Sequence, residues 1–456
     1  MEKRERFASR LGFILISAGC SIGLGDVWRF PYITGQYGGG IFVLIYLICI
    51  VALGLPIMTM ELAVGRASQK SIATSFREME RKGQQWHLMG YAGIVGNYLL
   101  MMFYTTIAGW MLAYFYKFMI GQFNGLNTQQ VGEVFASLTA NPFEMIIWMV
   151  ITVAFCFGVC SLGLQNGVEK VTKVMMVLLL AIVAVLAVKS MTLPNASAGL
   201  KFYLLPDLNR VQEKGIWETI FAAMSQAFFT LSLGVGSMAI FGSYIGKERN
   251  LFGESINIAS LDTGISLIAG LIIFPACFSF GVDPGEGPGL VFVTLPNIFN
   301  SMSGGRIWGS LFFIFMTFAA YSTVIAVFEN IISFGMDLWG WSRKKASLIN
   351  TFLITLLSVP CILGFNVLSW FQPLGKGTSI LDLEDFILSY NLLPIGSLVY
   401  LLFCVTRYGW GFDNYMKEVN TGEGIKLPRA FKGYFQWVLP IIILIVLIQG
   451  YINFFG

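Results

Sequence analysis

Residues 19–31 read Gly-Cys-Ser-Ile-Gly-Leu-Gly-Asp-Val-Trp-Arg-Phe-Pro, so three glycines, one aspartate and one arginine interrupt an otherwise apolar segment. A charged side chain at the bilayer centre costs about 2.5–3.5 kcal/mol on insertion scales, so Asp26 and Arg29 should face protein or a water-filled cavity. Each glycine costs a helix about 1 kcal/mol, which favours a helix that unwinds in mid-membrane and frees backbone groups as ligands. The ends of two half-helices can bind a carboxylate and a cation side by side, so this stretch predicts a solute site.

The composition is that of a polytopic membrane protein, because 56% of the 456 residues are hydrophobic and only 12% are charged. A membrane span needs about 20 apolar residues. The sequence contains eleven candidates, near residues 11–34, 38–64, 88–120, 143–162, 167–188, 216–245, 255–281, 305–338, 346–366, 384–406 and 432–455. The expected fold class is therefore an all-α membrane protein with eleven transmembrane helices.

The distribution of Lys and Arg predicts the orientation of these spans. Basic residues concentrate before the first candidate span and after the second, sixth, eighth and tenth, whereas residues 121–142 and 282–304 contain none. By the positive-inside rule, the basic segments are cytoplasmic. We expect a multi-pass protein of the inner (plasma) membrane with a cytoplasmic N-terminus, an external C-terminus and no cleavable signal. The net charge of +4 reflects this topology and does not indicate nucleic-acid binding.

Two other functional classes are disfavoured. An enzyme needs a nucleophile with a base or a metal centre, but His87 is the only histidine and the seven cysteines lack metal-ligand spacing. We therefore expect no catalytic residues. A channel or receptor needs a continuous polar pore or a ligand-responsive face, whereas the polar residues here cluster at mid-depth between groups of opposite charge.

The sixth candidate span repeats the unusual composition of the first. Residues 225–237 read Ser-Gln-Ala-Phe-Phe-Thr-Leu-Ser-Leu-Gly-Val-Gly-Ser. Small residues at a helix–helix contact are one explanation. The other is a pair of interrupted spans in corresponding positions of two repeats, which points to a transporter site. The two stretches are five spans apart, which suggests a repeat of five spans whose second copy is inverted. Residues 1–190 would form the first repeat, 191–410 the second, and 411–456 a cytoplasmic linker with span eleven.

Two further spans carry polar groups. Asp262 and Ser266 lie one helical turn apart in the seventh span, and an intramembrane carboxylate indicates a functional site. In the eighth span, Ser322 and Thr323 either turn towards a cation or bond back to their own helix. The external segment 282–304 is expected to form a lid.

The sequence resembles the neurotransmitter:sodium symporter family, whose bacterial members carry amino acids. The resemblance covers nearly the whole chain, and its most specific motifs are Arg10-Leu-Gly-Phe and residues 23–32, 38–40 and 226–234. It implies sodium-coupled symport of hydrophobic or aromatic L-amino acids into the cell by alternating access. A proton-coupled amino-acid carrier is the alternative.

The resemblance also implies the site residues. The substrate pocket corresponds to Cys20, Ser21, Leu24, Gly25, Leu100, Tyr104, Phe229, Thr230, Ser232, Val235, Thr323 and Val327. The first of two sodium sites corresponds to Ser21, Asp26, Thr230 and Asp262, and the second to Gly19, Ile22, Ala319, Ser322 and Thr323. The outer gate corresponds to Arg29 with Asp385 under Phe229, and the inner gate to Arg4 with Asp337, near Phe7 and Tyr244.

Three departures from the family pattern matter. The chain has eleven candidate spans where many members have twelve. Val235 stands where a bulky aromatic can line the pocket, which predicts a wider side-chain compartment.

The third departure is that Asp26 and Asp262 stand where the family usually has asparagine. Two sodium ions, a zwitterionic substrate and two ionised aspartates are neutral together, so chloride would add uncompensated charge. At a separation of ~6 Å and an effective dielectric constant near 20, the repulsion between chloride and each aspartate is about 3 kcal/mol. Chloride is therefore not expected, and one aspartate should take a proton after sodium leaves.

Overall fold

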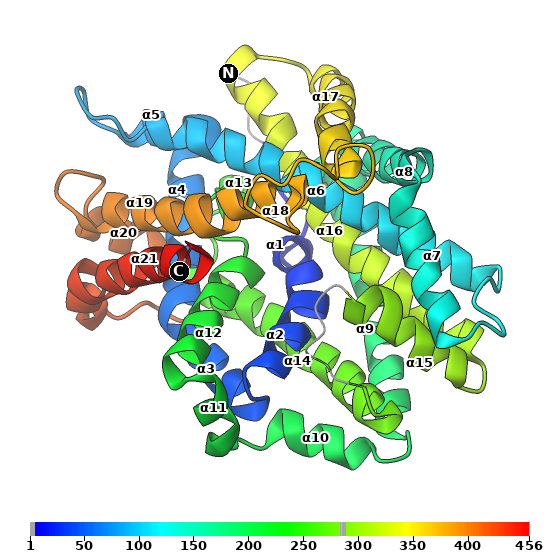
Figure 1. Ribbon diagram of the computed structural model, residues 1–456. Helices are drawn as coiled ribbons and strands as arrows, with labels where there is room; N and C mark the ends of the chain where they lie inside the picture. Colours follow the sequence, from blue (N-terminus) through cyan, green and yellow to red (C-terminus); the bar gives the residue numbers. More distant parts are fainter. Residues whose placement is uncertain (1–4, 283, 285–288, 456) are drawn as a thin grey trace.

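The computed structural model describes residues 5–282, 284 and 289–455, and this part of the chain is helical apart from turns, loops and one isolated β-bridge between Arg249 and Glu423 (Figure 1). The α-helices are α1 (Arg10–Ser21), α2 (Phe30–Gln36), α3 (Gly40–Cys49), α4 (Leu55–Ser68), α5 (Ile72–Met79), α6 (Leu88–Met119), α7 (Thr128–Ala140), α8 (Pro142–Ser161), α9 (Lys170–Met191), α10 (Ala196–Leu204), α11 (Leu208–Lys214), α12 (Ile216–Thr230), α13 (Ser237–Tyr244), α14 (Leu251–Phe280), α15 (Leu295–Ser301), α16 (Gly305–Trp339), α17 (Arg343–Leu363), α18 (Ile380–Asp385), α19 (Leu393–Val405), α20 (Phe412–Val419) and α21 (Leu439–Phe455). A short 3₁₀ turn covers Arg429–Phe431.

Six π-helical turns lead directly into α-helices, and proline explains five of them. The six turns are Gly25–Arg29, Ile50–Gly54, Leu164–Glu169, Leu290–Thr294, Phe386–Leu392 and Tyr434–Val438. All but the third are followed by a helix whose second residue is proline. Proline has no N–H and its ring clashes with the carbonyl four residues earlier. In each case the residue before the proline donates instead to the carbonyl five residues earlier, which widens the helix into a π turn.

Nine helical segments of the described chain are long and apolar enough to cross a membrane. The pair Arg10–Ser21 and Gly25–Gln36 is bent by 55° and makes a tenth if it is one span. The sixth candidate span is divided between α12, with 15 residues, and α13, with 8, so neither piece reaches a spanning length alone. This division accounts for the difference from the eleven spans that hydropathy predicts.

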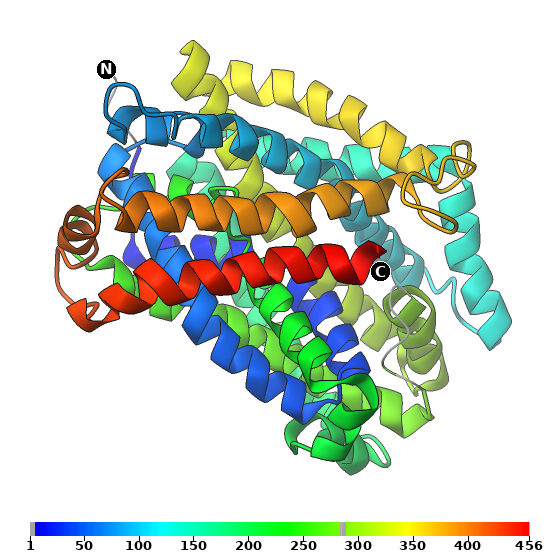
Figure 2. The same cartoon turned by 60° about the vertical axis from the view of Figure 1, so that its left-hand side comes forward.

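The bent pair of helices α1 and α2 lies inside the molecule. Helices α1 and α2 cross its centre in Figure 1, and α1 contacts α9, α14 and α16. In the most apolar 18-residue stretch of the central α16, 83% is buried inside the molecule. In the corresponding stretch of the last span, which contains α21, only 28% is buried. Figure 2 shows α19 and α21 side by side on one face of the molecule. The outer helices present large apolar side chains such as Phe352 and Trp437, as expected of surfaces that contact lipid.

The predicted external lid is partly packed into the fold. Residues 283 and 285–288 lie outside the described part. The rest includes the π turn at 290–294 and α15, whose side chains Leu290, Phe292 and Leu295 are fully buried.

Candidate functional site

The first interruption lies between α1 and the π turn that begins at Gly25. Helix α1 ends at Ser21, and Ile22 is extended, with φ −63° and ψ 98°. The Asp26 carboxylate accepts the N–H of Gly23 at 3.0 Å, and the N–H of Leu24 donates to the Tyr104 hydroxyl at 3.0 Å. A Cβ on Gly23 would lie 2.3 Å from that hydroxyl oxygen, so a residue without a side chain is required there.

The second interruption spans residues 231–236 between α12 and α13, and Glu61 of α4 stabilises it. Ser232, Gly234 and Gly236 all have positive φ, at 51°, 95° and 73°. The fully buried Glu61 carboxylate accepts the N–H groups of Gly234 at 2.5 Å and Met238 at 3.1 Å. These N–H groups lack helical partners, so the carboxylate replaces the missing helix bonds.

Asparagines support the same break from another side. Asn97 donates to the Val235 carbonyl at 2.9 Å, and Asn330 donates to the Asn97 side-chain oxygen at 3.0 Å. Sequence reasoning assigned no role to Glu61, Asn97 or Asn330. The signal available for Glu61 was a lone carboxylate inside an apolar span, the same signal that singled out Asp262.

Two buried aspartates lie beside the first interruption. Asp26 accepts the Thr230 hydroxyl at 2.5 Å and also the Ser266 hydroxyl. Asp262 is fully buried and interacts electrostatically with Asp26, and neither of its oxygens accepts a hydrogen bond from the described residues under strict geometry. The Ser21 side chain on α1 interacts with it. A buried carboxylate with so little hydrogen bonding needs a cation or a proton. The residues present therefore fit a sodium ion at this position.

A second group of oxygens gathers between α1 and α16. The Ser322 hydroxyl lies 2.9 Å from the Ala319 carbonyl oxygen and 3.4 Å from that of Ile22, and the Thr323 hydroxyl lies 3.3 Å from the latter. The Gly19 carbonyl is 3.4 Å from Thr323. Carbonyl and hydroxyl oxygens are the ligands that hard cations prefer. All five residues predicted for the second sodium site are thus brought together.

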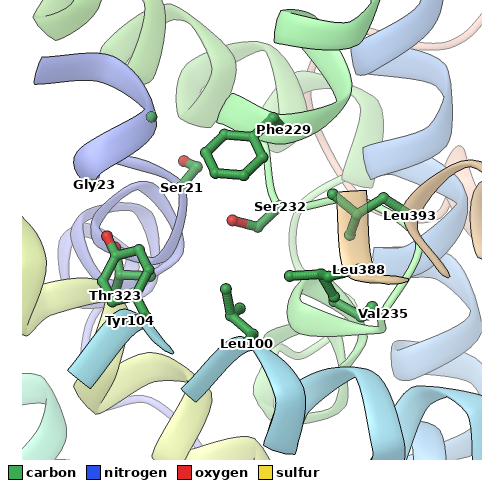
Figure 3. A pocket seen from close by; sticks show the side chains of 11 residues that line it. Ser21, Gly23, Leu100, Tyr104, Phe229, Ser232, Val235, Thr323, Leu388 and Leu393 are labelled. Carbon is green, nitrogen blue, oxygen red and sulfur yellow. The ribbon is translucent and has the colours of Figure 1, made fainter. Parts of the chain in front are cut away.

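A small cavity lies between the interruptions. Its lining comprises Ser21, Gly23, Gly25, Leu100, Tyr104, Phe229, Ser232, Val235, Thr323, Leu388 and Leu393 (Figure 3). Eight of these were predicted from the sequence. The other four predicted pocket residues, Cys20, Leu24, Thr230 and Val327, are buried but do not belong to this lining. Gly23, Leu388 and Leu393 were not predicted.

The end of the cavity that the predicted topology places outside, the external end, is covered by Arg29 and Phe229. The Arg29 guanidinium carbon lies 4.2 Å from the centre of the Phe229 ring, a cation–π contact. In the described part of the chain no ion pair joins Arg29 to Asp385, whose carboxylate accepts the Ser389 hydroxyl at 2.6 Å. The structure therefore brings Arg29 onto Phe229 without the predicted pairing to Asp385.

The opposite end, which the predicted topology places on the cytoplasmic side, is closed by polar contacts. Arg4 of the predicted inner gate lies outside the described residues. Asp337 accepts the N–H and hydroxyl of Ser71 at 2.9 and 2.7 Å and lies 3.6 Å from the Lys70 ammonium. Glu329, fully buried, pairs with Arg343 at 2.6 Å and accepts the Tyr244 hydroxyl at 2.7 Å. Phe7 packs edge-on against Tyr244, at 5.8 Å between ring centres. The Glu329–Arg343 pair was not predicted.

Comparison with known proteins gives this architecture a class. The profile of the Sodium:neurotransmitter symporter family matches residues 4–128 and 130–455. An uncharacterised sodium-dependent transporter of Bacillus subtilis is 34% identical over 455 residues, covering 100% of this chain and 98% of the relative. A sodium- and chloride-dependent taurine transporter of the dog is 27% identical, covering 96% and 77%. The crystal structure of MhsT in complex with L-phenylalanine matches with a TM-score of 0.88 and 37% identity over 98% of this chain and 100% of that one.

The molecule is therefore a multi-pass membrane transporter and not an enzyme. The chain belongs to the sodium:neurotransmitter symporter family, whose members are sodium-dependent transporters.

Proposed function

We propose that this protein imports hydrophobic or aromatic L-amino acids by sodium-coupled symport, through alternating access. The observation that carries the proposal is the division of the buried cavity into a polar end and an apolar end. Gly23, Ser21 and Tyr104 form the polar end, beside both groups of cation-binding oxygens, and the remaining lining is largely apolar. MhsT, solved with L-phenylalanine, supports the substrate class by its similarity.

The polar end suits an α-carboxylate. The Tyr104 hydroxyl accepts the Leu24 N–H and keeps its own hydrogen to donate. In this proposal the substrate carboxylate meets that hydroxyl, the backbone near Leu24 and Gly25, and one sodium ion. Lys or Glu would leave a charged group desolvated among Leu100, Val235 and Phe229, at a cost of several kcal/mol.

The oxygens on the two sides of α1 suit two sodium ions, which we treat as co-transported substrates. We propose that the first binds at Asp26 and Asp262 with Ser21 and Thr230, and the second among the carbonyl and hydroxyl oxygens of α1 and α16. Because the two aspartates balance both sodium charges, we propose that transport does not require chloride. We also propose that one aspartate carries a proton outward on the return step.

The proposed topology has eleven transmembrane helices in two inverted repeats of five spans, with unwound first and sixth helices and a cytoplasmic N-terminus. Residues 1–190 and 191–410 are the repeats, and 411–456 contain the linker and span eleven. The placement of interruptions in the first and sixth candidate spans supports this arrangement.

Uptake into proteoliposomes tests the function. Radiolabelled phenylalanine should accumulate under an inward sodium gradient, and leucine, methionine, tyrosine or tryptophan should compete while lysine and glutamate should not. A proton gradient without sodium should drive no accumulation; if it does, the alternative of a proton-coupled carrier is correct. Accumulation of none of the twenty amino acids would reject the proposal.

A further inference from the structure

Two leucines of the tenth candidate span line the cavity, although neither lies in the interrupted spans. Leu388 belongs to the π turn Phe386–Leu392 and is 1% exposed, and Leu393 begins α19 and is 4% exposed. Figure 3 shows both beside Val235, across the cavity from Tyr104 and Thr323. They therefore stand at the end where the side chain of a bound amino acid would lie.

The π turn is what places both leucines on one face. In a regular α-helix, residues five apart point about 140° away from each other, because each residue turns the chain by about 100°. Here the N–H of Leu393 donates to the carbonyl of Leu388, the i to i+5 bond of a π turn, so the two residues lie one above the other. Pro394 explains the geometry, because it cannot donate to the carbonyl of Tyr390, four residues earlier.

Direct backbone contact holds this face against the second interruption. A Cβ on Gly234 would lie 2.1 Å from the Leu393 carbonyl oxygen, and a Cβ on Gly396 would lie 1.9 Å from the Gly234 carbonyl oxygen. No side chain separates the two segments there. The position of Leu393 relative to Ser232 and Val235 is thus determined by main-chain contact. Side-chain rearrangement cannot change this position.

Val235 is held from behind as well. A Cβ on Gly96 would lie 2.8 Å from a methyl carbon of Val235 and 3.4 Å from one of Leu392. Because Val235 is small, it leaves space in the cavity, and Leu388 and Leu393 extend into this space from the tenth candidate span. Val235, Leu388 and Leu393 therefore set the size of the apolar end on this side, across from Leu100 and Phe229.

We propose that Leu388 and Leu393, aligned by the π turn before Pro394, determine which apolar side chains the cavity accepts. This inference rests on the proposed function and names specificity-determining residues of the same site. Removing carbon atoms from these leucines enlarges the end of the cavity and favours the largest substrates, and adding them favours small ones. Contacts with the substrate's carboxylate and amino group do not change.

The test measures competition of alanine, valine, leucine, phenylalanine and tryptophan against a labelled substrate. In Leu388→Ala and Leu393→Ala, the ratio of tryptophan to valine affinity should rise at least about tenfold, since one methylene in an apolar pocket is worth about 10–200-fold. Leu388→Phe should lower it. The control Ile395→Ala changes a side chain of the same helix that is 42% exposed on the outer surface and should leave the ratio unchanged. If an alanine variant is not recovered as a monodisperse protein, the same ratio is measured in Leu388→Met and Leu393→Val, where a shift supports the proposal and an unchanged ratio rejects it.

A second pair of variants tests the π turn without altering either leucine. Pro394→Ala restores a backbone donor and should shift the size ratio by turning Leu388 away from the cavity. Pro440→Ala makes the same change after the π turn Tyr434–Val438, which does not line the cavity, and should leave the size ratio unchanged. An unchanged ratio in Pro394→Ala and both leucine variants rejects the inference while leaving the proposed function standing. A wild type that transports no amino acid rejects the proposed function itself.

Discussion

The two ends of the cavity are closed by different kinds of contact. At the cytoplasmic end, Glu329 is paired with Arg343 and Tyr244, and Asp337 is held by Ser71 and Lys70. At the external end, Arg29 rests on Phe229, and the carboxylate of Asp385 is bonded within its own helix. The inner end is therefore stabilised by charge pairs already in place, whereas the outer pair has still to form. The difference predicts that closure of the outer end, unlike that of the inner end, depends on what binds.

The largest expected effect is at the cytoplasmic end. Glu329→Ala should lower stability by about 3–5 kcal/mol, because it leaves the largely buried Arg343 guanidinium without its closest partner. Thermal unfolding in detergent measures the loss, and uptake should fall with it. Glu329→Gln keeps an acceptor for Tyr244 and should lose less. An unchanged melting temperature in Glu329→Ala would contradict the view that this pair holds the inner end.

The matching change at the external end should separate transport from stability. Asp385→Ala removes no ion pair of the described state, so it should change stability by about 0.5 kcal/mol or less. Uptake should nevertheless collapse, because Arg29 then has no carboxylate to meet on closure. Ser389→Ala removes only the hydroxyl that bonds Asp385 and serves as the control. Near-normal uptake by Asp385→Ala would exclude this pair from the mechanism.

A smaller effect should follow from changing the ligand on which the external end depends. Phenylalaninamide lacks the carboxylate proposed to meet Tyr104 and sodium. A hydrogen bond to a charged group contributes about 1.5–3 kcal/mol, so the amide should compete roughly tenfold to a hundredfold less well than phenylalanine. Phenylalaninol, which also lacks the carboxylate, is the control and should compete as weakly. Competition by the amide equal to that of the free acid would disprove the assignment of the polar end.

The smallest expected effect is that of chloride on the wild-type protein. Replacing chloride by gluconate at fixed sodium should leave the uptake rate unchanged, because the buried Asp26 and Asp262, ionised when sodium is bound, would balance the two sodium charges. Asp262→Asn should either abolish transport or create a need for chloride. Tyr46, Gln226, Thr230 and Ser266 resemble the chloride ligands of chloride-dependent family members, and a wild type that stops when chloride is withdrawn would assign that role to them.

The sequence alone determined where the chain is interrupted. Glycines and charges at 19–31, and glycines and polar side chains at 225–237, violate the local rules of an apolar helix, and such violations are visible without any partner. The same reasoning located Asp262. It placed the spans by hydropathy, but it did not reveal how α12 and α13 divide the sixth one, because hydropathy averages over a break.

Only the tertiary structure decided which groups complete the site. Glu61 accepts the backbone N–H of Gly234, 173 positions away in the sequence. Arg343 forms an ion pair with Glu329, a pairing that no local sequence pattern predicts. The prolines before which π turns form were visible in the sequence, but a proline shows only that a helix must deform. Whether Leu388 and Leu393 then face a cavity or the lipid depends on what packs against that helix. Here the answer comes from the main-chain contact between Gly234 and α19, which arises when distant segments fold together.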